Sequence, residues 1–456
     1  MHRHILHATT AVLCAAVTGC TVAPRPVSLP PRRPLGRDIE APAPTSPGPT
    51  SPDTPAPRPT ETLTLRDALA LALLGNPSLA AASWDIRAAE ARTLQAGLRP
   101  NPELEAEVEE VAGEGARSGV DAAEAGLVLS QAIELGGKRP KRVRVAELEG
   151  ELAGWDYEAQ RLAVLTDAAK AFVEVLAAQE RAALAEQLAR LAEQGHQTVA
   201  EKIKAGKESA VEGDKARVAL ATSRIERAQA QRELAARRRA LAALWGAKTA
   251  AFGRVEGQLD ALAPVPPEGA LTGFLADNPE LARWGTERRQ REAKLVLERA
   301  KATPDVTVSG GLQYFNEDDG GSFILGLGLP LPLFDRNQGG IREAQAERDK
   351  AREAQRAAEV RLHADLAKAY QDLAAAHTEA STLQDEVLPA AERAFAAAQE
   401  GYRKGKFGYL EVLDAQRTLF EGRQRLIVAL AAYHKAVADV EHLIGRSLSS
   451  VTQETQ

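Results

Sequence analysis

Histidine, cysteine and paired carboxylates are the side chains of this chain that could take part in chemistry. Beyond residue 20 the sequence contains five histidines: His196, His363, His377, His434 and His442. None lies three or four residues from another, and neither a His-Glu-x-x-His nor a Cys-x-x-Cys sequence occurs. The spacing therefore predicts no site for zinc, copper or another soft metal. Because no Walker A loop, dinucleotide fingerprint or nucleophile elbow occurs either, we expect no cofactor and no enzyme.

Cys20 follows a segment that is typical of bacterial export signals. A basic start at Arg3 leads into a short apolar run, and the small residues directly before Cys20 resemble a lipobox. We expect residues 1–19 to be removed and Cys20 to be acylated, with a plain secretory signal as the alternative. Removal of that segment also removes Cys14, so no intramolecular disulfide could form.

The segment that follows Cys20 is rich in proline. Residues 21–62 contain 13 of the chain's 25 prolines, mixed with Thr, Ser and Ala. This composition predicts an extended, mobile tether over 20–62, between a lipid on Cys20 and a folded body that starts near Leu63. A Pro-rich ligand for a partner is the alternative. The net charge of -6 gives no sign of nucleic-acid binding.

An internal repeat organises the body of the chain. Asn76 and Pro77 recur as Asn278 and Pro279, about two hundred residues later. Each copy reads as helix, β-hairpin, very long helix, turn and very long helix. We expect the first repeat over residues 63–262, the second over 263–445, and a tail over 446–456.

The predicted hairpins have strands of about ten residues with one apolar face. The first hairpin is expected over 103–112 and 125–135. In the second, Val306 to Tyr314 alternate apolar and polar residues, and Phe323, Leu325, Leu327 and Leu329 share one face. This pattern is typical of membrane β-barrels, and a soluble hairpin over a core is the alternative. A hairpin between long helices cannot bury its own face, so it must assemble with other hairpins.

Long helices make up most of the predicted fold. Residues 142–195 contain no proline, and a 4-3 spacing of apolar residues predicts side-by-side helix packing in the second repeat. That spacing runs through Leu362, Leu366, Ala369, Leu373, Ala376, Ala380, Leu383 and Val387. Pro389 is expected to interrupt the longest helix. The fold class is therefore mainly α with a small β part, built from long antiparallel coiled-coil-like helices and two β-hairpins.

Three stretches are similar to the outer-membrane efflux protein (TolC-like) family, in its heavy-metal branch of the cobalt-zinc-cadmium or copper type. They are residues 129–139 and 329–339, at the strand-to-helix junctions, and 401–417, at the second hairpin tip. The resemblance implies a homotrimer with a 12-stranded outer-membrane β-barrel on an α-helical periplasmic tunnel. It implies a passive exit duct for heavy-metal cations in the outer membrane of a Gram-negative bacterium. Its partners would be outer-membrane lipid, a periplasmic adaptor protein and an inner-membrane RND pump.

Two other functions remain open at this point. The same architecture could serve drug efflux or type I secretion. A periplasmic coiled-coil structural lipoprotein is the alternative from a different class, but it would need no apolar strand face such as that of Phe323 to Leu329.

The resemblance also implies the site residues. Glu411 and Asp414 would form a ring of carboxylates that selects cations at the periplasmic mouth; two solvated helix-face acids are the alternative. Repulsion within such a ring would be costly unless cations, or nearby basic groups such as Lys404, Lys406 and Arg417, offset it. The hairpin tips would be Gly206, Lys207, Gly405 and Lys406. At the strand-helix junctions, Gly136, Gly137, Gly339 and Gly340 would let the chain turn sharply from strand into helix.

Overall fold

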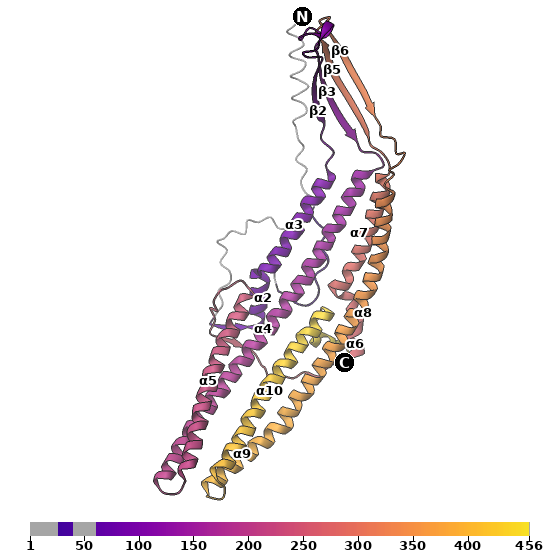
Figure 1. The fold of residues 1–456 in the computed structure, drawn as a ribbon. Helices are drawn as coiled ribbons and strands as arrows, with labels where there is room; N and C mark the ends of the chain where they lie inside the picture. The colour runs from indigo at the N-terminus through magenta and orange to yellow at the C-terminus, as the bar shows by residue number, and fades with distance from the viewer. Residues whose placement is uncertain (1–25, 40–60, 456) are drawn as a thin grey trace. The chain divides into compact units, whose positions relative to one another are not determined.

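A computed structural model describes residues 26–39 and 61–455 of the chain. The described part is mainly helical with two small sheets, which confirms the predicted fold class (Figure 1). The strands are β1 (Thr62–Thr64), β2 (Glu103–Glu109), β3 (Glu124–Ile133), β4 (Arg254–Glu256), β5 (Val306–Phe315) and β6 (Gly320–Gly328). The helices are α2 (Leu65–Gly75), α3 (Pro77–Gly97), α4 (Lys138–Lys204), α5 (Ala210–Ala243), α6 (Glu268–Thr272), α7 (Pro279–Lys301), α8 (Gln338–Thr382), α9 (Leu388–Arg403), α10 (Tyr409–Ile444) and α11 (Leu448–Thr455).

The two predicted hairpins join into one antiparallel sheet. Its strand order is β2-β3-β5-β6, and the central register pairs Ile133 with Val306. Strand β2 ends at Glu109, earlier than predicted, because Glu110 and Ala112 have φ values of 56° and 62°. This left-handed backbone cannot continue a strand. Both hairpins are therefore confirmed, and their pairing through β3 and β5 brings the two repeats together.

The chain enters the first long helices through a cap and a short parallel sheet. The Asp67 N–H donates to the Thr64 hydroxyl at 3.3 Å, and the Thr64 N–H donates to the Asp67 carboxylate at 3.2 Å. This reciprocal capping box fixes the start of α2. Strand β1, directly before it, pairs with β4. The sequence did not predict this pairing, because three-residue strands carry no readable alternation.

The repeated asparagines perform the same task in both repeats. The Asn76 amide donates to the Leu244 carbonyl at 2.8 Å, and its oxygen accepts from the Ser78 N–H at 2.9 Å. The Asn278 amide donates to the Leu443 carbonyl at 2.9 Å, and its oxygen accepts from the N–H two residues ahead at 2.8 Å. Each asparagine thus caps one helix and binds the end of another, which explains why the Asn-Pro pair recurs.

Helix α4 is longer than expected, with 67 residues. It includes Pro140, which lies in the first turn, where a missing N–H breaks no helical hydrogen bond. The interruption predicted near Pro389 is present, but it does not lie in the longest helix, which is α4. A π-turn over Leu383–Val387 separates α8 from α9. There the Leu388 N–H donates to the Leu383 carbonyl, because proline at the next position cannot donate. No helix in the described ranges is both long enough and apolar enough to cross a membrane.

The described residues form two compact units. One comprises residues 26–28, 85–153 and 285–352 and includes the four-stranded sheet. The other comprises 29–39, 61–84, 154–284 and 353–455 and includes both hairpin tips. In this second unit Leu366, Leu373, Tyr433 and Val440 lie in one buried cluster. The predicted 4-3 seam is confirmed here except at its last residue, Val387, which is 40% exposed.

Residues 26–39 form an ordered segment, here called the N-terminal strap. The predicted mobile tether includes this segment, so the prediction is wrong for these residues. The Arg33 N–H donates to the Glu158 carboxylate at 2.6 Å, and the Leu35 N–H donates to the Gly445 carbonyl at 3.1 Å. Arg161, which is buried in an ion pair with Glu158 at 2.8 Å, donates to the Leu35 carbonyl at 3.0 Å. A Pro-rich sequence has no core of its own, but here the body supplies its hydrogen-bond partners.

Candidate functional site

The two long helical hairpins end in turns of the same construction. Gly206 and Gly405 have φ values of 67° and 70°. The N–H groups of Lys207 and Lys406 each donate to the carbonyl five residues earlier, at 2.8 Å. This closure is the Schellman motif, which needs one left-handed residue. A Cβ at either glycine would meet nothing within 4 Å, so glycine is favoured here for its backbone alone. All four predicted tip residues lie in these turns.

A polar bridge joins the tips of the two helical hairpins. The Tyr402 hydroxyl, at the end of α9, donates to the Glu208 carboxylate at 3.1 Å, in the turn before α5. The Lys202 ammonium of α4 lies 3.4 Å from the centroid of the Tyr402 ring, and the Tyr409 ring lies 5.7 Å away. Burial, followed by the bond to Glu208, raises the pKa of Tyr402 well above its usual value. The phenol therefore stays neutral and keeps its proton for the bridge.

Sequence reasoning missed this bridge. The chain has only six tyrosines, and Tyr402 and Tyr409 both flank the second tip. That concentration was the available signal. The partner Glu208 could not be identified, because nothing in the sequence states which side of each turn faces the other hairpin.

Glu411 and Asp414 lie in the first two turns of α10, and both are exposed. In the described part of the chain neither carboxylate takes part in an ion pair. Glu212 occupies the matching position in the first repeat, but it pairs with Lys215 at 2.9 Å. The second tip therefore carries two exposed acids outside any direct ion pair, whereas the matching acid of the first tip is paired.

The basic residues expected to offset these acids bind other carboxylates. Lys404 pairs with Glu400 at 3.0 Å, and Arg417 pairs with Glu421 at 2.6 Å. Residues four apart on one helix are neighbours, so these local pairs form more readily than contacts across the turn. Within the described chain, neither Lys404 nor Arg417 therefore forms an ion pair with these acids. The bond to Glu421 and, to a smaller extent, the charge of Asp414 raise the pKa of Arg417.

The strand-helix junctions use different residues in the two repeats. Gly136 and Gly137 have φ values of 68° and 64°, as expected for a sharp turn. In the second repeat Asn337 has the positive φ, at 57°, whereas Gly339 and Gly340 lie inside the first turn of α8. Asparagine tolerates this backbone, so the turn does not require these glycines. Gly340 instead permits close packing, because its Cβ would lie 2.5 Å from the Asn337 side-chain oxygen.

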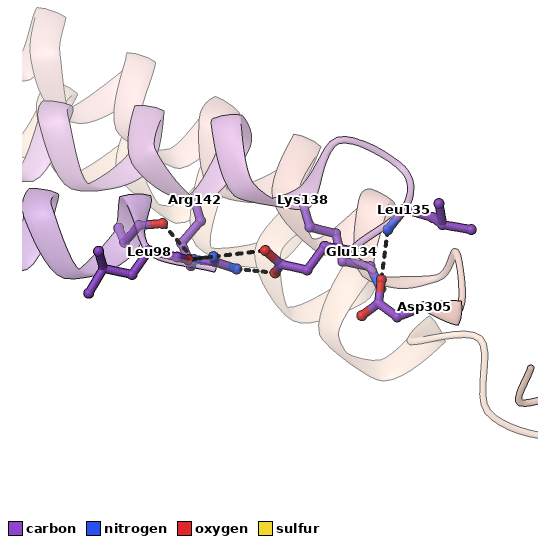
Figure 2. Close-up of polar contacts among 7 residues, drawn as sticks. Leu98, Glu134, Leu135, Lys138, Arg142 and Asp305 are labelled. Atoms are coloured by element: carbon purple, nitrogen blue, oxygen red, sulfur yellow. Dashed lines mark hydrogen bonds and ion pairs between the residues drawn. The ribbon is translucent and has the colours of Figure 1, made fainter. Parts of the chain in front are cut away.

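Ion pairs fix the first junction, as Figure 2 shows. Arg142 of α4 pairs with Glu134 at 2.6 Å and donates to the Leu98 carbonyl at 3.1 Å. Lys138 pairs with Asp305 at 2.8 Å, and the Leu135 N–H donates to the same carboxylate. Burial alone would raise the pKa of Asp305, but these two partners hold it below its usual value. At this junction, ion pairs thus connect segments from both repeats.

The four-stranded sheet has two contrasting faces. The register places apolar side chains from all four strands on one face, and that of Leu325 is 88% exposed. Members of this apolar face are Leu104, Val108, Leu127, Leu129, Val308, Leu312, Phe323, Leu325 and Leu327. The opposite face carries the β2 glutamates Glu103, Glu105, Glu107 and Glu109, with Glu124 of β3. One face suits an apolar environment and the other suits water and cations.

Two further predictions concern Cys20 and metal binding. Cys20 lies outside the described residues. Over residues 26–39 and 61–455, no group of three or more His, Cys, Asp or Glu side chains is placed to hold a metal ion.

The chain is similar to known outer-membrane proteins along most of its length. The family described as outer membrane efflux protein matches residues 68–247 and 271–446. A relative is the cobalt-zinc-cadmium resistance protein CzcC of Cupriavidus metallidurans, 38% identical over 384 residues. That match covers 84% of this chain and 90% of the relative.

Solved structures share the fold. The CmeC outer membrane channel of Campylobacter jejuni superposes with a TM-score of 0.71 at 17% identity, covering 86% of this chain and 88% of that one. The outer membrane protein VceC of Vibrio cholerae gives a TM-score of 0.70 at 20% identity, covering 84% and 96%. The resemblance inferred from the junctions and the second tip is thereby confirmed. The chain belongs to the outer membrane efflux protein family.

Proposed function

We propose that this outer membrane efflux protein is a passive exit duct for divalent heavy-metal cations, without catalytic activity. The observation that carries the proposal is the four-stranded sheet. Its apolar face is exposed in the single chain, while its opposite face presents a row of carboxylates. A wall with apolar residues on one side and charged residues on the other separates lipid from a water-filled path.

Self-assembly follows from the edges of this sheet. Within the described residues, the outer edges of β2 and β6 have no strand partner. Unpaired edges are very costly in lipid, so copies of the sheet must join edge to edge. Helix α5 supports the same conclusion, because Val211, Val218 and Ile225 are exposed seven residues apart. Such a stripe suits a neighbouring helix. We take the assembly to be a homotrimer with twelve strands.

Cations are the favoured cargo because two separate places carry groups of exposed acids. The β2 glutamates line one face of the sheet, and Glu411 with Asp414 lie at the second tip. Three-fold symmetry would repeat both sets around one axis, an arrangement that attracts cations and repels anions. The relative named for cobalt, zinc and cadmium resistance supports metals as that cargo.

The partners of the duct follow from its place in a tripartite system. The hairpin tips would meet a periplasmic adaptor protein and, through it, an inner-membrane RND pump. Acylation of Cys20 would add a lipid anchor in the outer membrane. The Tyr402–Glu208 bridge would hold the tips together in the resting state.

The test is complementation in a Gram-negative host that lacks the outer-membrane component of a cobalt-zinc-cadmium efflux system. We expect expression of this chain, with its cognate adaptor and pump, to restore growth in zinc, cobalt or cadmium. Native mass spectrometry of the extracted protein should give three copies.

The alternatives give different results in the same strains. Restored drug resistance or protein secretion without metal resistance, from a correctly assembled trimer, would replace metal efflux with one of these functions. A protein recovered from the periplasm as a folded monomer would contradict the channel itself.

A further inference from the structure

The helix ends that adjoin the four-stranded sheet form one row. Arg142 links the start of α4 to Leu98, after the end of α3. Lys138 links the start of α4 to Asp305, after the end of α7. The Asn337 amide, before α8, donates to a carbonyl of α7 at 2.8 Å. The row therefore runs α3, α4, α7, α8, in the same order as the strands above it.

Basic residues occupy equivalent positions of this row in both repeats. Arg99 and Lys301 each lie three residues before the proline that precedes the first strand of its repeat. Arg139 and Arg342 each lie two residues after the junction glycines. All four are exposed, and Lys301 pairs with Glu298 at 2.7 Å. Among the residues that the structure describes, the three arginines have no ion-pair partner.

Helix stability does not explain the arginines at the helix starts. The first turns of α4 and α8 contain no acidic residue. The amino end of a helix carries partial positive charge, so Arg139 and Arg342 lie where a cation destabilises the helix. An anion from outside the chain would reverse that cost.

An apolar loop follows β6 at the same end of the sheet. Leu329, Leu331 and Leu333 are exposed in the loop directly after Gly328, the last residue of β6. Leu331 is 70% exposed and Phe334 is 90% exposed. Arg336 comes next, and its guanidinium donates to the Pro332 carbonyl at 3.0 Å. An apolar surface thus meets a guanidinium within a few residues.

We propose that this junction binds anionic phospholipids of the membrane leaflet that lies nearest the helices. Acyl chains would contact the apolar loop of Leu331, Leu333 and Phe334. The phosphate groups would contact the junction arginines, defined as Arg99, Arg139, Arg336 and Arg342. Exposed aromatic and basic side chains at the end of an apolar strand face suit the boundary between acyl chains and headgroups. The inference rests on the proposed function, because it requires the sheet to lie in a membrane.

The test is lipid binding to the purified trimer, measured by native mass spectrometry after titration with phosphatidylglycerol or phosphatidylethanolamine. We expect the wild-type trimer to retain phosphatidylglycerol preferentially. The double variant Arg139→Gln with Arg342→Gln should lose that preference, with roughly fivefold weaker binding for each arginine removed. Arg139→Lys with Arg342→Lys keeps the charges and should retain most of the binding.

A matched control removes two arginines elsewhere. Arg254→Gln with Arg393→Gln removes the same charge at two exposed positions of the second unit and should leave binding unchanged. Equal losses in both double variants would overturn the site, as would full displacement of the lipid by millimolar inorganic phosphate, which has no acyl chain for the apolar loop.

A second measurement tests the proposed function independently of the lipid site. Cation conductance of the same variants is measured in membranes of phosphatidylethanolamine alone. A wild-type trimer that conducts but has no preference for phosphatidylglycerol refutes the lipid site and leaves the duct intact. Preferential lipid binding by a protein that never conducts supports the site and counts against the duct.

Discussion

The Tyr402 hydroxyl lies 3.1 Å from the Glu208 carboxylate and thereby joins the tips of the two helical hairpins. Tyr402 belongs to the second repeat and Glu208 to the first. The bond therefore joins the two repeats at the tips of their helical hairpins. Tyr402 itself lies in a buried cluster with Val199, Ala216 and Val412. A tip held in this way can separate only when the hydrogen bond breaks.

Tyr402→Phe should increase conductance in planar bilayers. The variant keeps the ring and its contact with Lys202 but loses a hydrogen bond to a charged group, worth about 1.5 kcal/mol or more. The population of separated tips should rise roughly tenfold. Tyr370→Phe, whose hydroxyl forms no hydrogen bond within the described residues, is the control. Equal conductance in both variants would mean that the bridge does not hold the resting state.

Neutralising both acids of the second tip should lower cation selectivity. Glu411→Gln with Asp414→Asn leaves the fold intact, because both side chains are exposed and no described residue forms an ion pair with them. The reversal potential in a salt gradient should move toward zero, and block by divalent ions should weaken. Glu212→Gln removes the equivalent acid of the first repeat, which Lys215 already compensates, and should have a smaller effect. An unchanged reversal potential in an assembled double variant would identify the acids as merely solvated.

His434 should make the protein less stable in acid. Its Nε2 donates to the Leu259 carbonyl at 2.8 Å. Burial lowers the pKa of His434 from 6.5, although the bond to Leu259 and the charge of Asp260 oppose the shift. As the pH falls below about 6.5, the unfolded chain therefore takes up a proton that the folded chain resists, and the free energy of unfolding decreases.

His434→Gln keeps a donor without a titrating group, so the fall in melting temperature between pH 7.5 and pH 5.5 should become smaller. His363→Gln is the control, because that histidine is exposed. A pH profile that His434→Gln does not alter would contradict this assignment.

Glu158→Gln should destabilise the second unit strongly. It leaves Arg161, 1% exposed, without its ion pair, which costs about 3 kcal/mol or more. Chemical denaturation should show this loss, and limited proteolysis should cut the N-terminal strap faster. Asp372→Asn breaks an exposed pair with Lys368 and should cost under about 1 kcal/mol. Similar losses from both substitutions would indicate that the buried ion pair contributes no more to stability than the exposed one.

Local signals made much of the fold predictable. The hairpins alternate apolar and polar residues, the absence of internal proline predicted α4, and each Asn-Pro pair marks a helix start. The π-turn before Pro389 could not be placed, because a proline predicts a disturbed hydrogen bond but not which turn widens. The role of Asn337 was hidden because asparagine adopts left-handed backbone less often than glycine.

Tertiary contacts account for the rest. The N-terminal strap is ordered by partners such as Glu158 and Gly445, more than a hundred residues away. The tip bridge depends on which faces of two hairpins meet. Glu411 and Asp414 were identified through resemblance, whereas the structure added that both are exposed.

The position of the N-terminal strap also limits the distance between Cys20 and helix α4. From Cys20 to Val27 the chain has seven residue steps, which span at most about 24 Å when fully extended. Val27 lies against Gly150 of α4, where a Cβ would come within 2.7 Å of it. Gly150 is twelve residues from the start of α4, or about 18 Å along the helix axis. If Cys20 is acylated as proposed, seven residue steps are enough for the lipid to reach the level of the strand-helix junction, and they would keep Val27 within about 24 Å of the lipid anchor.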